Sequence, residues 1–346
     1  MSKSRRECRN LRNRHESTFS DNDWEVLITF WYPVAFSTEI TNRPLKRRLL
    51  DVDLLLVRYK DEPVVVLDRC PHRGAMLSQG RFEGGVFECA YHGIQFGVDG
   101  QCLRIPSAPP EFQPPSNLRL YCARSKERYG FVWVCLDPCS ERELPVWPDL
   151  AHGTFQRVEM QLELKTGAGR HIENFCDTAH FSLAHLGTFG SAEHAQVPPY
   201  DLESAAPFEL GFSVMTYLKA SGRPNSRAQH VQEVLSHYVV KLPYLAQLKE
   251  QLGGDQVRCI YDFLCPVTAE TCRMLMVMTR NFDYDEPVEN WIRYQEIVNE
   301  EDRVIVEGQR PLELPVRESS EVHVPTDKFS LEYRRKLKEL GIEGGC

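Results

Sequence analysis

Two short loops carry the residues of this chain that are best suited to chemistry. Cys70-Pro71-His72 and Cys89-Ala90-Tyr91-His92 each offer one thiolate and one imidazole, and sixteen residues separate the two loops. In a two-iron, two-sulfide cluster, two cysteines can bind one iron while two histidines bind the other, and this exchange of ligands raises the reduction potential. Such a centre takes electrons from a lower-potential donor and passes them on. The pattern therefore predicts an electron-transfer centre that needs an acceptor elsewhere in the protein.

A zinc site is the alternative interpretation of the same four residues. Zinc also accepts two cysteines and two histidines, but common zinc-binding sequences pair like ligands, two cysteines followed by two histidines. The mixed pairing in each loop and the strand-like surroundings favour the iron–sulfur cluster.

A second group of metal-binding side chains lies further along the chain. Asn174, Asp177, His180 and His185 fall within twelve residues, in a segment from residue 171 to 186 that reads as a helix stopped by Gly187. Two imidazoles and one carboxylate can bind iron and leave neighbouring coordination positions open for dioxygen and substrate.

The spacing of the two histidines sets a geometric problem. Residues five apart differ by about 140° around an ideal helix, so His180 and His185 cannot both face one ion from a straight helix. We expect the helix to end or to distort between them. Asp177 lies three residues before His180, on the same face, and is better placed to hold the other ring nitrogen of His180 than to bind metal. Asn174 is a candidate for a supporting contact.

The third metal ligand is expected in the acidic run Glu300-Glu301-Asp302 of a late helix. Asp302 is the inward-facing candidate because most residues on its helix face are apolar. These residues are Val298, Ile305, Val306 and Gln309. Helical spacing separates Asp302 from Glu301 only weakly, and Glu300 and Glu301 are interpreted as a solvated helical face.

At this point the sequence resembles the oxygenase component of the Rieske non-heme iron oxygenases. The segments that carry the resemblance extend over most of the chain: Cys70-Pro-His72-Arg-Gly, Cys89-Ala-Tyr-His92-Gly, Arg104–Ser107, Glu127–Trp133, Glu173–His185 and Glu301-Asp302-Arg-Val. The short chain is more similar to the dicamba, vanillate and toluenesulfonate monooxygenase group than to the longer α-subunits of arene dioxygenases.

The resemblance implies a role for each group of ligands. Four residues would bind the Rieske 2Fe–2S cluster: Cys70, His72, Cys89 and His92. His180, His185 and Asp302 would bind a mononuclear Fe(II). In a head-to-tail homotrimer, Asp177 would connect His180 to His92 of a neighbouring subunit.

The implied fold is α+β, with an all-β Rieske domain followed by a helix-grip catalytic domain built on an antiparallel sheet. We expect a basic tail at residues 1–20, the Rieske domain at 21–140 and the catalytic domain at 141–346. Strands are predicted at 52–59, 63–68, 130–136, 156–164, 257–264 and 273–279, and helices at 171–186, 291–309 and from Phe329 to Gly341. The two cluster loops are expected at the tips of hairpins.

Composition limits the partners and the location. The chain has 346 residues and a formal charge of −8, and such an acidic surface argues against nucleic acid or anionic lipid as the main partner. No apolar run approaches the roughly twenty residues of a membrane span. Arg5-Arg6 precedes no apolar segment, so an export signal is rejected. Twelve irregularly spaced cysteines are consistent with a reducing cytoplasm.

The predicted function is that of a terminal oxygenase that hydroxylates or O- or N-demethylates a small, aromatic substrate with dioxygen. The chain has no G-x-G-x-x-G nucleotide loop, so NAD(P)H would be oxidised by a separate reductase, acting directly or through a ferredoxin. Two alternatives stay open: a cis-dihydroxylating arene dioxygenase, and an electron carrier without catalysis. Several residues could line a pocket or belong to the core: Phe189, Met215, Tyr217, Met276 and Met278. Seven histidines receive no role: His15, His152, His171, His194, His230, His237 and His323.

Overall fold

The computed structural model describes residue 11 and residues 17–151, 155–204, 206–219, 223–224, 230–317 and 321–344. The described residues form two compact units, one made of residues up to 18 with Leu27–Leu144 and the other of Phe19–Val26 with the residues from Pro145 onward. The predicted basic tail at 1–20 lies outside the described residues, apart from residue 11 and residues 17–20.

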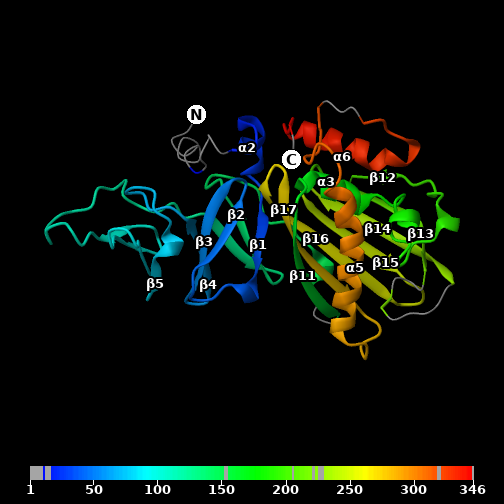
Figure 1. Cartoon of the computed structure of the whole chain (residues 1–346), viewed down its shortest axis with the longest axis horizontal. Helices are drawn as coiled ribbons and strands as arrows, with labels where there is room; N and C mark the ends of the chain where they lie inside the picture. The colour runs from blue at the N-terminus through cyan, green and yellow to red at the C-terminus, as the bar shows by residue number, and fades with distance from the viewer. Residues whose placement is uncertain are drawn as a thin grey trace. The chain divides into compact units, whose positions relative to one another are not determined.

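The first unit is built from short antiparallel strands in three sheets (Figure 1). One sheet has the order β1-β10-β9, with bounds Tyr32–Phe36, Phe131–Cys135 and Arg124–Arg128. The second consists of β2 (Leu45–Leu49), β3 (Val52–Tyr59) and β4 (Glu62–Leu67). The third consists of β5 (Arg81–Glu83), β6 (Val86–Glu88), β7 (Gln95–Gly97) and β8 (Cys102–Arg104). The strands predicted at 52–59, 63–68 and 130–136 are all present.

The two cluster loops of this unit have matching backbone hydrogen bonds. The N–H of Cys70 donates to the carbonyl of Ala75 at 2.8 Å, and the N–H of Cys89 donates to that of Ile94 at 3.0 Å. Near the end of each loop, a glycine with positive φ donates its N–H back to the cysteine carbonyl at 2.9 Å: Gly74 and Gly93. A side chain disfavours this backbone conformation, which explains the glycine in each loop.

The expected hairpin position holds for one loop only. The second loop joins β6 to β7, which are antiparallel neighbours, as predicted. The first loop instead joins β4 of one sheet to β5 of another, by way of a short 3₁₀ helix at Leu77–Gln79. A strand pattern alone does not show that the chain changes sheets at this point.

The second unit is a seven-stranded antiparallel sheet with a long helix lying across it (Figure 1). The strand order is β11-β17-β16-β15-β14-β13-β12. In chain order the bounds are Gln156–Leu164, Leu202–Glu203, Glu209–Lys219, Val231–Lys241, Leu245–Gln251, Val257–Thr268 and Thr271–Arg280 for β11 to β17. The helices are α2 (Asp21–Leu27), α3 (Ala168–Cys176), α4 (Phe181–Ala184), α5 (Val288–Val306) and α6 (Lys328–Glu339). The α+β fold with a large antiparallel sheet is confirmed.

The helix predicted at 171–186 is interrupted, but not where we expected. It ends at Cys176, before His180, because Asp177 is extended with φ −83° and ψ 122°. A separate four-residue turn, α4, then runs between the two histidines. The expected break between His180 and His185 is therefore wrong in position. The late helices are present as α5 and α6, and Gly341 ends the last helical segment with φ +91°.

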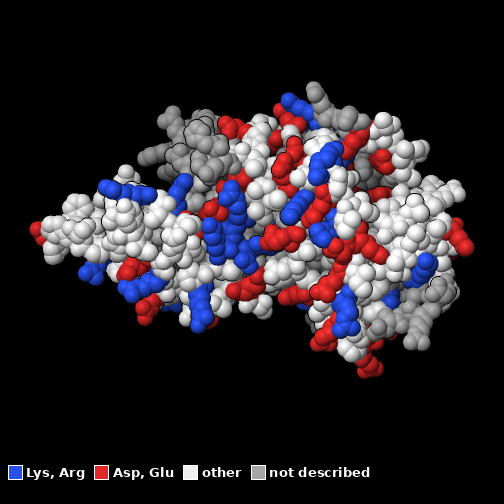
Figure 2. All heavy atoms as spheres, viewed as in Figure 1, with Lys and Arg blue, Asp and Glu red and all other residues white. Residues whose placement is uncertain are grey.

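The exposed side of α5 and α6 is polar, with basic and acidic side chains next to one another (Figure 2). Arg303 pairs with Glu300 on α5, and Arg335 pairs with Glu332 on α6. None of the helices within the described ranges is both long enough and apolar enough to cross a membrane.

Candidate metal centres and pocket

The first candidate centre combines buried thiols with accessible imidazoles. Cys70 and Cys89 are almost fully buried, while His72 is exposed and His92 is half-buried. The two imidazole rings lie close together, with 4.7 Å between their centroids. Burial raises the pKa of the Cys70 thiol to about 11, against a smaller opposing effect of the His72 backbone N–H. Two thiols on the inner side and two imidazoles at the surface fit a Rieske cluster with its histidine-bound iron outward.

The second candidate centre is a triangle of three ligand atoms. The Nε2 atoms of His180 and His185 are 3.1 Å apart, and each lies 3.3 Å from Oδ1 of Asp302. These three residues form the group that can hold a metal ion among the described residues. Two ligand atoms at a right angle and about 2.1 Å from one metal are separated by about 3.0 Å. The donor set and its spacing therefore fit a two-histidine, one-carboxylate iron site.

The break after α3 is what lets the two histidines converge. His180 immediately precedes α4 and His185 immediately follows it, so their rings face the same point from the two ends of one short turn. The loop after His185 is tight: the N–H groups of Thr188 and Gly190 both donate to the His185 carbonyl, at 3.0 and 2.7 Å. A Cβ on Gly190 would lie 2.1 Å from the Phe181 carbonyl oxygen, so this loop requires glycine.

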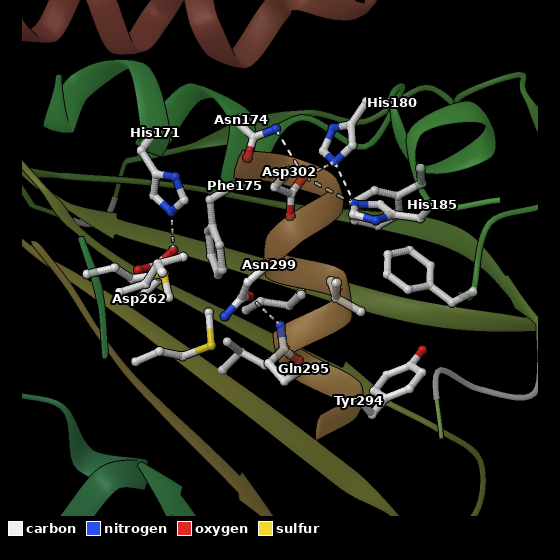
Figure 3. Close-up of a pocket in the computed structure, with 18 of the residues that line it drawn as sticks. His171, Asn174, Phe175, His180, His185, Asp262, Tyr294, Gln295, Asn299 and Asp302 are labelled. Carbon is white, nitrogen blue, oxygen red and sulfur yellow. Dashed lines mark hydrogen bonds and ion pairs between the residues drawn. The ribbon is translucent and has the colours of Figure 1, made fainter. Parts of the chain in front are cut away.

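The structure places Asp177 and Asn174 beside the triangle. Oδ2 of Asp177 lies 3.3 Å from Nδ1 of His180, and its Oδ1 accepts a 2.8 Å hydrogen bond from the N–H of Ala179. The amide nitrogen of Asn174 donates to Oδ1 of Asp302 at 3.3 Å. Figure 3 shows the side chains of Asn174, His180, His185 and Asp302 directed at the same small region beside one end of α5.

Glu301 is a site residue that the sequence interpretation missed. Its Oε2 lies 2.8 Å from Nδ1 of His185 and accepts a 2.7 Å hydrogen bond from the Thr188 hydroxyl. The interpretation as solvated surface is therefore wrong for Glu301, although it holds for the exposed, ion-paired Glu300. A metal-binding histidine usually donates its other ring nitrogen to a carboxylate, and that requirement was the available signal.

The three ligand side chains perturb one another strongly. Burial raises the pKa of Asp302, but hydrogen bonds with the two imidazoles lower it more, so the pKa lies well below its usual range. Burial lowers the pKa of His180, but hydrogen bonds with Asp177 and Asp302 raise it further, to about 9. A cation that binds at the triangle therefore displaces the proton on His180, because a metal ion binds the neutral imidazole.

A pocket extends from the triangle between α5 and the sheet and has a volume of about 750 Å³, including the space at its open mouth. Its walls are mainly apolar, with contributions from strands and helices: Leu162, Phe175, Leu218, Leu248, Ile260 and Met274. Among the candidates named from sequence, Phe189 and Met276 line this pocket. Met215 is partly exposed on β13, and Tyr217 stacks on His194. A mainly apolar lining of this kind suits an aromatic molecule.

Three polar pairs interrupt the apolar walls, and Figure 3 labels two of them, Gln295 with Asn299 and His171 with Asp262. Gln295 donates to the side-chain oxygen of Asn299 at 2.9 Å. The other two pairs are charged: Arg258 with Glu250 and His171 with Asp262. His171 received no role from the sequence because its partner lies on a distant strand.

Comparison with known families decides what this arrangement is. Residues 30–122 match the Rieske 2Fe–2S domain, and residues 164–342 match the vanillate O-demethylase oxygenase C-terminal domain. This chain is a Rieske non-heme iron oxygenase. The oxygenase family uses a Rieske cluster, mononuclear iron and dioxygen, so the recognition from sequence is confirmed and the zinc and electron-carrier alternatives are not retained.

Similar proteins share nearly the whole length of the oxygenase. The methylxanthine N1-demethylase of Pseudomonas putida is 28% identical over 94% of this chain and 92% of its own length. The structure of that demethylase with caffeine superposes with a TM-score of 0.81 and 27% identity, over 93% of both chains. The dicamba monooxygenase structure bound to dicamba shares the fold, with a TM-score of 0.74 and 21% identity over 91% of this chain and 97% of that one.

Proposed function

We propose that this oxygenase removes methyl groups from, or hydroxylates, a small aromatic substrate held in the pocket beside His180, His185 and Asp302. In N-demethylation, the N-methyl substrate, dioxygen, two electrons and two protons give the substrate with N–H in place of N–CH3, formaldehyde and water. The observation that carries the proposal is the ligand triangle placed at one side of a mainly apolar pocket.

We assign the metal centres as follows. Cys70, His72, Cys89 and His92 hold the Rieske cluster, and His180, His185 and Asp302 hold a ferrous ion. When bound, the cluster supplies single electrons and the ferrous ion supplies activation of dioxygen. The cluster belongs to a domain at residues 21–140 and the ferrous ion to a domain at 141–346, and the family matches at 30–122 and 164–342 support this division. The compact units differ from these bounds in that Phe19–Val26 groups with the second unit and the boundary falls after Leu144.

The remaining residues of the site position the ligands and the substrate. Asp177 and Glu301 each hold the outer nitrogen of one histidine, which fixes the ring orientation and its tautomer. Asn174 donates to Asp302 and keeps that carboxylate turned toward the histidines. The apolar walls exclude water and direct a bound ring toward the triangle.

Electrons would come from a separate NAD(P)H-dependent reductase, directly or through a ferredoxin. They would reach the iron across a subunit contact in a homotrimer, from His92 of one subunit to Asp177 and His180 of the next. In support of this route, His92 is half-buried and the side chain of Asp177 is 38% exposed, so a second protein can approach each of them. The cytoplasmic location stays a prediction.

The test is reconstitution of the purified oxygenase with a Rieske-oxygenase reductase, NADH and a panel of methylated aromatic compounds. We expect oxygen uptake coupled to formaldehyde release. With isotopically labelled dioxygen and an aryl-methyl probe, we expect a benzylic alcohol with one labelled oxygen. A product with two labelled oxygens would support the dihydroxylation alternative, and a reducible cluster with no oxygen uptake would contradict the proposal.

A further inference from the structure

The charged groups of the pocket form pairs with one another. Arg258 is the one lysine or arginine among the described residues that line this pocket, and its Nε lies 2.6 Å from Oε2 of Glu250. Both side chains are almost fully buried, at 6% and 4% exposure. The two charges therefore compensate each other inside the pocket wall, and Arg258 pairs with Glu250 rather than with a ligand.

The second charged pair leaves two polar atoms without partners. Nε2 of His171 lies 2.8 Å from Oδ2 of Asp262, and both side chains are buried. Nδ1 of His171 and Oδ1 of Asp262 have no hydrogen-bond partner in the described structure. Buried polar atoms are rarely left unpaired in native proteins, so these two atoms call for an explanation. In the view of Figure 3 the pair lies on the opposite side of Phe175 from Asp302.

The balance of charge in the pocket is unfavourable for an anion. The charged side chains of the described lining already have partners: Glu250 pairs with Arg258, Asp262 with His171, and Asp302 with the ferrous ion proposed above. A substrate carboxylate would lose its water on entry and would find no lysine or arginine among the described lining residues left to pair with it. An uncharged molecule avoids that cost, because it needs only hydrogen bonds to compensate its polar atoms.

We propose that the substrate of this oxygenase is an uncharged aromatic molecule whose polar group pairs with Nδ1 of His171 or Oδ1 of Asp262, and that aromatic carboxylates are rejected. The inference rests on the proposed function, because it takes this pocket as the place of oxidation. His171 and Asp262 act here as specificity residues. Their contact would fix one end of the ring and leave the opposite end at the iron ligands.

The state of His171 supports its role as a donor. Burial lowers the pKa of His171, but the Asp262 carboxylate raises it more, with a smaller contribution from Asp302, so the net pKa lies above the ordinary value. A protonated ring has N–H groups at both nitrogens. Nδ1 can then donate to a carbonyl or ring nitrogen of the substrate, while Oδ1 of Asp262 accepts from an N–H.

The test uses compounds that differ in charge and little else. Binding of 3-methoxybenzamide and 3-methoxybenzoate to the metal-loaded oxygenase is measured by isothermal titration calorimetry. Two further pairs are 4-methylbenzamide with 4-methylbenzoate and 3-(methylamino)benzamide with 3-(methylamino)benzoate. We expect each amide to bind at least roughly tenfold more tightly than its acid. Equal or tighter binding of the acids overturns the inference, as does the absence of amide binding in all three pairs.

Variants then test the two residues. Asp262→Asn and His171→Gln should each weaken amide binding by roughly tenfold. The matched control is His237→Gln. His237 lies on β14, its Nδ1 is 2.8 Å from the Ser213 hydroxyl oxygen on β13, and it does not line the pocket. Melting temperatures identify a variant that fails to fold, and the other variant then decides. Wild-type affinity for the amides in a folded Asp262 or His171 variant overturns the assignment.

Product analysis separates this inference from the proposed function. If the amides bind selectively but no formaldehyde forms with reductase and NADH, the proposed oxidation is wrong and the charge selectivity stands. If the carboxylates are demethylated as well as the amides, the oxidation stands and the charge selectivity is wrong.

Discussion

At the scale of single residues, each of the two histidines proposed to bind iron is held by a carboxylate from a different segment. Asp177 contacts Nδ1 of His180 from the extended residue after α3, and Glu301 contacts Nδ1 of His185 from α5. Glu301 is the tighter contact, at 2.8 Å against 3.3 Å, and it shares its oxygen with Thr188. The two carboxylates also differ in exposure, which suggests different roles.

Glu301 should matter for iron affinity. Glu301→Ala removes the partner of His185 and should weaken Fe(II) binding by roughly 10–100-fold, while Glu301→Gln keeps an acceptor oxygen and should lose less. The measurement is Fe(II) titration of the apoprotein, with cluster absorbance as a check on the first unit. The neighbouring Glu300→Ala is the control because Glu300 pairs only with Arg303 on the exposed side of α5. Equal affinities in the Glu301 and Glu300 variants would contradict the role.

Asp177 should matter for electron transfer rather than for metal loading. Asp177→Ala should leave the cluster and the ferrous ion bound and lower turnover at least tenfold, because the proposed electron route runs through this carboxylate. The rate at which the reduced cluster reoxidises in a single turnover with substrate and dioxygen is the direct readout. A normal rate in this variant would show that electrons take another path.

At the scale of elements, the iron-ligand segment is held from both sides. Glu173 on α3 accepts two hydrogen bonds from Arg334 on α6, at 2.5 and 2.8 Å, and Arg334 also donates to Glu321 at 2.7 Å. All of this network is buried or half-buried. It ties the last helix to the helix that precedes the iron ligands.

Arg334 should therefore contribute much more to stability than its neighbour. Arg334→Ala removes both hydrogen bonds of the buried Glu173 and leaves it only the longer, 4.0 Å ion pair with Arg170, so it should lower the free energy of unfolding by about 3–5 kcal/mol. Arg335→Ala removes an exposed pair with Glu332 and should have little effect on stability, because water and salt screen an exposed pair. Urea unfolding of both variants is the measurement. Similar losses in the two would contradict the importance of the buried network.

The His171–Asp262 pair should make stability depend on pH. The pKa of His171 is raised in the folded protein, so the pair contributes its full stability below about pH 6.5 and loses it as pH rises through the folded pKa. The difference in unfolding free energy between wild type and His171→Gln should thus be larger at about pH 6 than at about pH 9. Urea unfolding at both values measures it, and a difference that stays constant or grows with pH would contradict the ion pair.

At the scale of the whole molecule, the sequence predicted the elements better than the links between them. The ligand motifs, the strands predicted in both units and the late helix with Asp302 follow from local spacing and periodicity. The strands β12 to β15 of the large sheet were not predicted. The change of sheet after Cys70, the break at Asp177 and the contacts of Glu301 and His171 depend on partners far away in the chain. The helical period places Glu301 and Asp302 on neighbouring faces of α5. Only the folded structure shows that both side chains reach His185.

The central claim is that one chain holds a Rieske cluster and a separate iron bound by His180, His185 and Asp302. Iron and acid-labile sulfide content, measured side by side in wild type and in Asp302→Ala, tests this claim most directly. The account predicts about three irons and two sulfides per chain in the wild type, and about two irons and two sulfides in the variant, with unchanged cluster absorbance. About two irons in the wild type, or about three in the variant, would contradict it.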